Sequence, residues 1–282
     1  MLSSDALRAY LASADDASAR PEHDAARTER AGGLDRYRLF AARDPRALLG
    51  LEPRRRWSVE QLTALVADRC GATPTPLPPP PGLGEAGWRI DPGRTVAALA
   101  AFADVLASAV RRRAPVLLGT GRPHALLGFY GMLASALAGA GCRVLTPREG
   151  RGVEVPGAGG KRPFALSSVR GVALVHEIGL PCAPGAPGAP CRSPLPLRVT
   201  LADLAARGEG LPELVIGDHG WLCGAGQLGL DAVGPAGVSD PAPFVAEAEG
   251  TVGVVIPLHD TVARSHYLPL TRYVLNQARL SQ

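Results

Sequence analysis

The sequence predicts an α/β fold, specifically a mainly parallel, Rossmann-like three-layer sandwich with a helical N-terminal extension. Three observations indicate this class. Short apolar runs, such as residues 116–118 and 214–216, are bounded by proline or glycine, which is typical of strands buried on both faces. Segments with apolar residues at spacings of three and four separate these runs, as amphipathic helices do. Polar residues gather directly after the runs, where parallel sheets bind ligands.

The first 90 residues are predicted to form a helical extension and a proline-rich linker that pack on an α/β domain of residues 91–282. Apolar periodicity and N-caps predict the helices of the extension: residues 1–15, residues 34–49 with a new start at Asp44-Pro45, and residues 58–70 after a capping box of Ser58 and Gln61. Residues 73–87 are expected to run as polyproline II over the surface, with recognition by a proline-binding domain as an alternative.

The α/β domain is predicted to alternate strands and helices, starting with a helix over residues 93–113 that Asp91-Pro92 caps. Residues 162–169 and 171–178 form a hairpin, or the second run alone joins the sheet. The other expected strands are 116–118, 142–145, 214–216, 232–234 and 252–258; the other expected helices are about twenty residues after His124, 200–207, a short helix or turn at 224–230, 240–248 and 269–279. Residues 181–194, rich in proline and glycine, are expected to form a loop.

Composition excludes several classes of protein. Lys and Arg total 30 against 26 for Asp and Glu, a net charge of +4, which is too mild to predict binding of nucleic acid. Five cysteines without a C-x-x-C pair favour a reducing compartment, so we expect a cytoplasmic protein. The N-terminus lacks the pattern of a signal peptide and no apolar run approaches eighteen residues, so no membrane partner is expected. The oligomeric state is left open by the sequence.

A glycine turn follows the first predicted strand and is a candidate anion site. Gly119 and Gly121 permit close approach of a ligand to the backbone, Thr120 offers a hydroxyl, and Arg122 and His124 offer donors at a helix N-terminus. The turn lacks the G-K-[ST] ending of a phosphate-binding loop and is not G-x-G-x-x-G, so no nucleotide cofactor is predicted. A tight turn with a solvated arginine is the alternative.

Asp218 and His219 follow another buried run and are the candidate catalytic residues. A carboxylate there can bind a divalent metal or act as nucleophile or base, and histidine transfers protons near neutral pH. Asp240, His259 and Asp260 follow later elements and, with Asp218, are candidate ligands of a Mg²⁺ or Mn²⁺ ion. Gln227 is a candidate for orienting the ligand. Structural roles are the alternatives, namely an N-cap for Asp240, an N-cap or a turn for Asp218, and turns for the others.

With these residues assembled, the chain resembles an actinobacterial protein family whose members are named phosphatases, from about Tyr37 to Tyr273. Several short motifs carry the resemblance: Tyr37-Arg38-Leu39, Asp44-Pro45-Arg46, Trp57, Arg69-Cys70-Gly71, the turn from Gly119 to Leu127, the run from Gly141 to Pro147, Asp218-His219-Gly220-Trp221, Gly226-Gln227, the run from Ser239 to Ala242, the run from Glu247 to Gly250, and Val255-Ile256-Pro257-Leu258. One departure is notable: the family pattern implies histidines before Ser193-Pro194, and here Cys191-Arg192 stands there behind a proline and glycine tract.

The resemblance implies hydrolysis of a phosphate ester. We therefore expect a phosphatase for a phosphorylated small molecule, with the phosphate held at the turn of Gly119 to His124, Asp218 as metal ligand, nucleophile or base, and His219 protonating the leaving oxygen. The missing histidines favour an alternative, a non-catalytic or weakened paralogue that binds a phosphorylated metabolite or another anion. A sugar-phosphate isomerase or transferase is a further alternative.

Overall fold

A computed structural model describes residues 3–17, 33–71, 90–157, 160–179, 188–259 and 264–280. The linker predicted over residues 73–87 lies outside this described part, as does half of the predicted loop at 181–194. The helices and strands are α1 (Ser4–Ala17), α3 (Gly33–Ala41), α4 (Pro45–Leu48), α5 (Val59–Cys70), α6 (Pro92–Arg112), β1 (Pro115–Gly119), α7 (Pro123–Gly139), β2 (Arg143–Leu145), β3 (Gly152–Gly157), β4 (Gly160–Val169), β5 (Val172–Glu177), α8 (Leu195–Ala206), β6 (Leu214–Gly217), α9 (His219–Gln227), β7 (Asp231–Ala236), α10 (Pro241–Ala248), β8 (Val254–Pro257) and α11 (Tyr267–Gln277).

The strands form one eight-stranded mixed sheet in the order β3-β4-β5-β1-β6-β7-β8, with β2 also paired to β1. Strand β1 pairs in parallel with β2, β5 and β6, and the parallel pairing continues through β7 to β8. Strands β3, β4 and β5 pair antiparallel, so β4 and β5 form the expected hairpin and β5 also joins the main sheet. The predicted α/β class with a mainly parallel sheet is confirmed.

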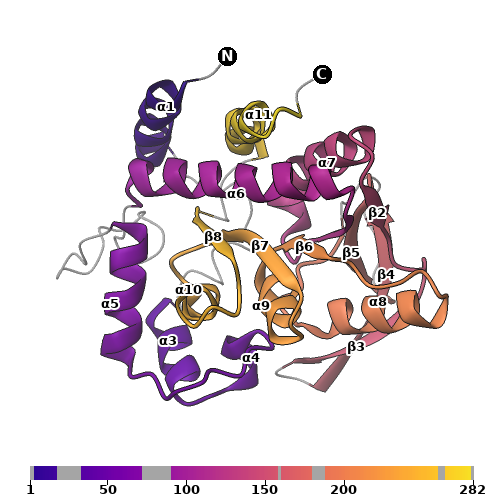
Figure 1. The fold of residues 1–282 in the computed structure, drawn as a ribbon. Coiled ribbons are helices and arrows are strands. Elements are labelled where there is room, and N and C mark those ends of the chain that lie inside the picture. Colours follow the sequence, from indigo (N-terminus) through magenta and orange to yellow (C-terminus); the bar gives the residue numbers. More distant parts are fainter. Residues whose placement is uncertain are drawn as a thin grey trace.

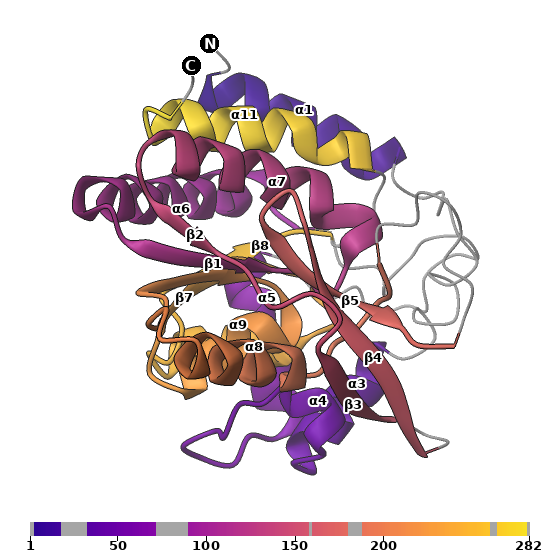
Figure 2. The same ribbon diagram turned by 90° about the vertical axis from the view of Figure 1, so that its right-hand side faces the viewer.

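Helices cover both faces of the sheet, as Figures 1 and 2 show. One layer holds α6, α7 and α11 with α1 beside them, and the other holds α8, α9 and α10. Side chains of the strands alternate between two cores: Val116 and Leu118 of β1 belong to the first, and Leu117 belongs to the second. Helices α3 and α5 of the N-terminal extension pack against α10, so they lie outside the second helical layer.

The sheet contains a point at which the strand order reverses. From β1 the chain passes through α7 to β2 on one side, whereas β6 pairs with β1 on the other side and leads outward through β7 to β8. Such a reversal leaves the loops after the two central strands on opposite faces of the sheet, and ligands of open α/β sheets bind between them. The ends of β1 and β6 are therefore the expected place for a ligand.

Most local predictions hold, and three differ. The capping box of Ser58 and Gln61 is present, and Asp44 and Asp91 cap their helices. Helix α8 begins five residues before the predicted residue 200, because proline is tolerated in a first helical turn. Helix α9 begins at His219 rather than at residue 224. The sequence did not predict this start because the glycines of α9 lower its helix propensity. The edge strand β3 was not predicted.

Helix α6 is the one described helix that is long and apolar enough to cross a membrane. It packs between β8 on one side and α1 and α11 on the other. Its buried residues, including Leu99, Phe102 and Leu106, belong to the core of the first helical layer. The long apolar face of α6 is therefore accounted for by packing inside the fold.

Candidate active site

Asp218 joins the ends of the two central strands. It occupies the N-cap position of α9 but makes no capping hydrogen bond there. Instead, its carboxylate accepts hydrogen bonds from the Thr120 hydroxyl at 2.7 Å and from the Gly121 backbone N–H at 2.6 Å, both in the turn after β1. The Thr120 hydroxyl in turn accepts from the backbone N–H of Arg122 at 2.9 Å. Asp218 thus fixes the predicted anion turn to the start of α9.

Close backbone contacts require glycine around this turn. The backbone N–H of Cys191 donates to the Gly121 carbonyl at 3.0 Å, and a Cβ at Gly121 would lie 2.2 Å from the Cys191 carbonyl oxygen. A Cβ at Gly220 would lie 2.3 Å from the carbonyl carbon of Ser193. The loop from Cys191 to Ser193 is therefore wedged between the turn after β1 and the start of α9, where only glycine leaves room.

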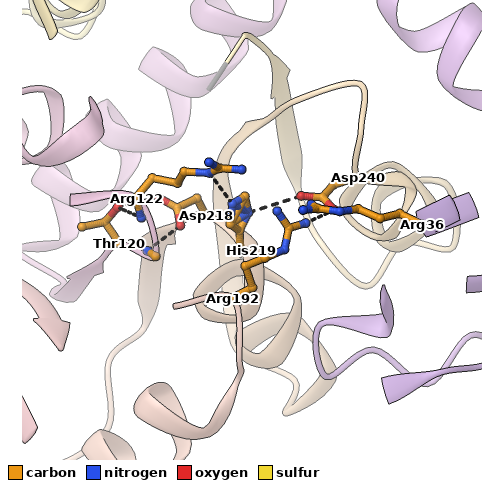
Figure 3. A network of polar contacts seen from close by, with 8 residues as sticks. Arg36, Thr120, Arg122, Arg192, Asp218, His219 and Asp240 are labelled. Carbon is orange, nitrogen blue, oxygen red and sulfur yellow. Dashed lines mark hydrogen bonds and ion pairs between the residues drawn. The ribbon is translucent and has the colours of Figure 1, made fainter. Parts of the chain in front are cut away.

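His219 lies at the centre of the site, as Figure 3 shows, and is almost fully buried. Its Nε2 atom lies 3.0 Å from Nε of Arg122, and its Nδ1 atom lies 3.5 Å from Oδ2 of Asp240. Because arginine can only donate, Nε2 must carry the lone pair of the neutral ring, and the proton sits on Nδ1 toward Asp240. The contacts therefore determine the tautomer.

Burial lowers the pKa of His219 well below its ordinary value, and the nearby arginine charges lower it further. The carboxylate of Asp240 opposes this shift without reversing it. The imidazole is therefore neutral at physiological pH. Its backbone has a φ of +47°, a left-handed conformation that costs a non-glycine residue about 1 to 3 kcal/mol.

Asp240 lies at the N-cap position of α10, as predicted, but its carboxylate does not cap the helix. Its Oδ1 atom pairs with Nη1 of Arg36 at 3.1 Å and is in close contact with the guanidinium of Arg192. Burial by itself would raise the pKa of Asp240, but Arg192 and Arg36 outweigh burial and hold it well below its ordinary value. Asp240 is therefore a buried anion that faces two arginines and a histidine.

The sequence prediction missed Arg36 and Arg192. Arg36 is on α3, 204 residues from Asp240 in the chain, and Arg192 is in the loop that the resemblance marked only for its missing histidines. Both side chains are largely buried, with 17% and 20% of their surface exposed. The motif at Tyr37-Arg38 pointed to the right part of α3, but no local pattern distinguishes Arg36 from its exposed neighbour Arg38.

The structure does not bring all predicted residues together. Gln227 lies at the opposite end of α9 from His219, where its side-chain oxygen accepts from the backbone N–H of Glu52 at 2.8 Å. His124 is exposed in the first turn of α7. The backbone carbonyl of His259 accepts from the Tyr267 hydroxyl at 2.6 Å. Asp260 lies outside the described residues.

The described residues contain no group of three or more His, Cys, Asp or Glu side chains placed to hold a metal ion. The carboxylates of Asp218 and Asp240 point to different partners, a hydroxyl and an amide for the first and guanidinium groups for the second. Arginine charges beside Asp240 also repel a cation. The donor set of this part of the chain therefore suits an anionic ligand better than a divalent metal.

Comparison with known proteins assigns the chain to a family. A family model described as Phosphatase matches residues 2–282. The chain belongs to this Phosphatase family. Phosphatase SCO2771 of Streptomyces coelicolor (strain ATCC BAA-471 / A3(2) / M145) is 37% identical over 257 residues, which cover 90% of each protein. No solved structure matches the chain.

The resemblance predicted from the sequence is thereby confirmed, and the chain is a phosphatase by its family and by its relative. Hydrolysis of a phosphate ester needs groups that bind an anion and a group that transfers a proton. The carboxyl ends of β1, β6 and β7 bring together both kinds of group, namely arginines and a neutral histidine. The hydroxyl and amide donors of the glycine turn are already bonded to Asp218.

Proposed function

We propose that this Phosphatase family member hydrolyses a phosphate monoester of a small molecule at the ends of β1 and β6. The phosphate would bind at the turn of Gly119 to His124, with the Arg122 guanidinium as its main partner. The observation that carries the proposal is the position of Arg122, whose Nε atom lies 3.0 Å from Nε2 of the buried, neutral His219. An anion binder thus lies directly against a proton acceptor.

In the proposed reaction, the phosphate draws the Arg122 guanidinium toward its oxygens and exposes Nε2 of His219. A water molecule attacks phosphorus, and His219 accepts a proton from that water at Nε2. The bond between phosphorus and the ester oxygen breaks, and the leaving oxygen takes a proton from solvent. The low pKa of His219 supports this role of base over the predicted role of acid, because the ring must be neutral to accept a proton.

Asp218 and Asp240 have different supporting roles in this proposal. Asp240 stabilises the imidazolium that forms at His219, since its Oδ2 lies 3.5 Å from Nδ1. Asp218 holds the phosphate-binding turn, because both of its oxygens already accept hydrogen bonds from that turn. A nucleophilic Asp218 would have to release both of these bonds, which would also free the turn that it holds.

The test is release of inorganic phosphate from a panel of small phosphomonoesters, measured with the wild-type protein and with His219→Gln. We expect the wild type to release phosphate from part of the panel and the variant to be slower by about 100-fold or more. Orthovanadate should raise the melting temperature of both proteins, because the anion-binding groups remain in the variant. Full activity in His219→Gln would remove this histidine from the mechanism.

The panel also tests the other hypotheses. Stabilisation by the esters without release of phosphate would support the non-catalytic binding protein, and conversion of a sugar phosphate without free phosphate would support the isomerase or transferase. Each assay is run with Mg²⁺, with Mn²⁺ and with EDTA. Activity that EDTA abolishes and Mn²⁺ restores would assign a metal to the carboxylate candidates; equal activity in all three would support the metal-free reaction.

A further inference from the structure

We propose that Arg36, on helix α3 of the N-terminal extension, is a positioning residue of the active site that holds Asp240 and, through Asp240, the imidazole of His219. The inference rests on the proposed role of His219 as the proton acceptor. It makes the helical extension part of the catalytic machinery rather than an appendage packed on the α/β domain.

The two oxygens of Asp240 face different partners: Oδ1 contacts Arg36 of the extension and Arg192 of the loop before α8, and Oδ2 faces the catalytic histidine. Oδ1 accepts from Nη1 of Arg36 at 3.1 Å, and Oδ2 lies 3.5 Å from Nδ1 of His219. The carboxylate is only 3% exposed, so its contacts are shielded from water and hydrogen bonds between charged groups are strong there. A carboxylate fixed at one oxygen can rotate little at the other, which restricts the imidazole that faces it.

Helix α3 is itself anchored to the same loop. The hydroxyl of Tyr37 donates to the backbone carbonyl of Val238 at 2.6 Å, two residues before Asp240. Tyr37 is buried in the core that α3 and α5 share with α10. Two consecutive residues of α3 therefore contact the loop between β7 and α10. The Tyr37 side chain bonds to the backbone of the loop, and the Arg36 side chain bonds to the carboxylate of Asp240.

The groups around His219 determine the sign of the effect. Arg122 comes from the turn after β1, Arg192 from the loop before α8, Asp240 from the start of α10 and Arg36 from α3. Asp218 precedes His219 in the chain and is directed to the turn after β1. Burial and the arginine charges keep the pKa of His219 low, and Arg36 is one of these charges. Its removal therefore raises the pKa of the histidine.

The test compares Arg36→Gln and Arg36→Lys with Arg38→Gln. Arg38 is a matched control on the same helix, because it is exposed and its ion pair among the described residues is local, with Asp35 at 3.0 Å. We expect Arg36→Gln to lower kcat by about 100-fold, as small misplacements of a catalytic group do, with a smaller change in KM. Arg36→Lys keeps the charge and should recover part of the loss. Arg38→Gln should match the wild type.

The pH profile separates positioning from a merely structural role. In Arg36→Gln, the acid limb of kcat/KM should move to higher pH, because the base is protonated more easily without the neighbouring charge. A wild-type kcat with an unmoved acid limb, or an equal shift in Arg38→Gln, would overturn the inference. If Arg36→Gln does not fold, Arg36→Lys decides in its place. A kcat below the wild-type value with an unmoved acid limb supports the inference, because the charge is kept and the geometry is lost, and a wild-type kcat overturns it. Full activity of His219→Gln would instead overturn the proposed function.

Discussion

Replacement of Thr120 by valine tests whether Asp218 holds the phosphate-binding turn. Valine has nearly the shape of threonine, so the change removes a hydroxyl and leaves the packing of this buried residue intact. That hydroxyl donates to Oδ2 of Asp218 at 2.7 Å and accepts from the backbone N–H of Arg122 at 2.9 Å. Thr120→Val therefore removes two hydrogen bonds in the same turn, one of them to a charged group.

The expected loss follows from the two bonds. A hydrogen bond to a charged group contributes about 1.5 to 3 kcal/mol, and a bond between neutral groups contributes about 0.5 to 1.5 kcal/mol. We therefore expect Thr120→Val to lower the free energy of unfolding by about 2 to 4.5 kcal/mol. Because the same turn binds the phosphate in the proposed function, KM should rise as well.

Urea unfolding, followed by tryptophan fluorescence, measures this loss. Trp221 packs directly under the turn, since a Cβ at Gly119 would lie 2.3 Å from its ring, so its emission reports on this region. Thr120→Ser is the matched control because it keeps the hydroxyl, and it should retain most of the stability and the wild-type KM. Wild-type stability in Thr120→Val, or an equal loss in Thr120→Ser, would refute the role of this hydroxyl.

Three further predictions follow from the same contacts. Gly121→Ala should destabilise the protein by about 1 to 3 kcal/mol in thermal unfolding, because the added Cβ would overlap a backbone carbonyl. Gly128→Ala on α7 is the control: an added Cβ there meets no atom within 4 Å, so this change should stabilise the protein by up to about 1 kcal/mol. Asp218→Asn should raise KM and lower the melting temperature, while Asp231→Asn, at the exposed start of β7, should do neither. An unchanged KM and melting temperature in Asp218→Asn would contradict the role of Asp218 in holding the turn after β1. His219 should make the free energy of unfolding fall as the pH drops below 6.5, because its lowered pKa leaves the folded state with fewer bound protons than the unfolded state. In urea unfolding, the wild type should lose about 1 kcal/mol per pH unit more than His219→Gln. The same pH dependence of stability in both proteins would count against a buried neutral ring.

The site illustrates how N-cap positions can serve a function other than capping. Asp218 and Asp240 each directly precede a helix, where aspartate ordinarily accepts from the first helical N–H groups. Here, neither side chain caps its helix. One turns to the neighbouring strand end and the other to two arginines, so the positions that favour aspartate locally deliver carboxylates to the shared edge of the sheet.

The fold was largely predictable because the local spacing of apolar residues indicates most of its strands and helices. Short uninterrupted apolar runs and helical spacing predict the alternation of strands and helices, and the caps at Asp44, Ser58 and Asp91 predict three helix starts. Strand β3 was missed because an edge strand has a weak apolar pattern, and its pairing with β4 is what defines it. The start of α9 was missed because glycine obscures helical periodicity.

By itself, the sequence determined the α/β class and placed Thr120, Asp218, His219 and Asp240 after strands. It could not determine what their side chains contact, because such contacts depend on which strands are neighbours and on where the distant extension docks. Only the tertiary structure directed Asp218 to the turn after β1 and brought Arg36 to Asp240 across 204 residues of chain. Local patterns carry information over a few residues, whereas a binding site is assembled by packing between distant segments.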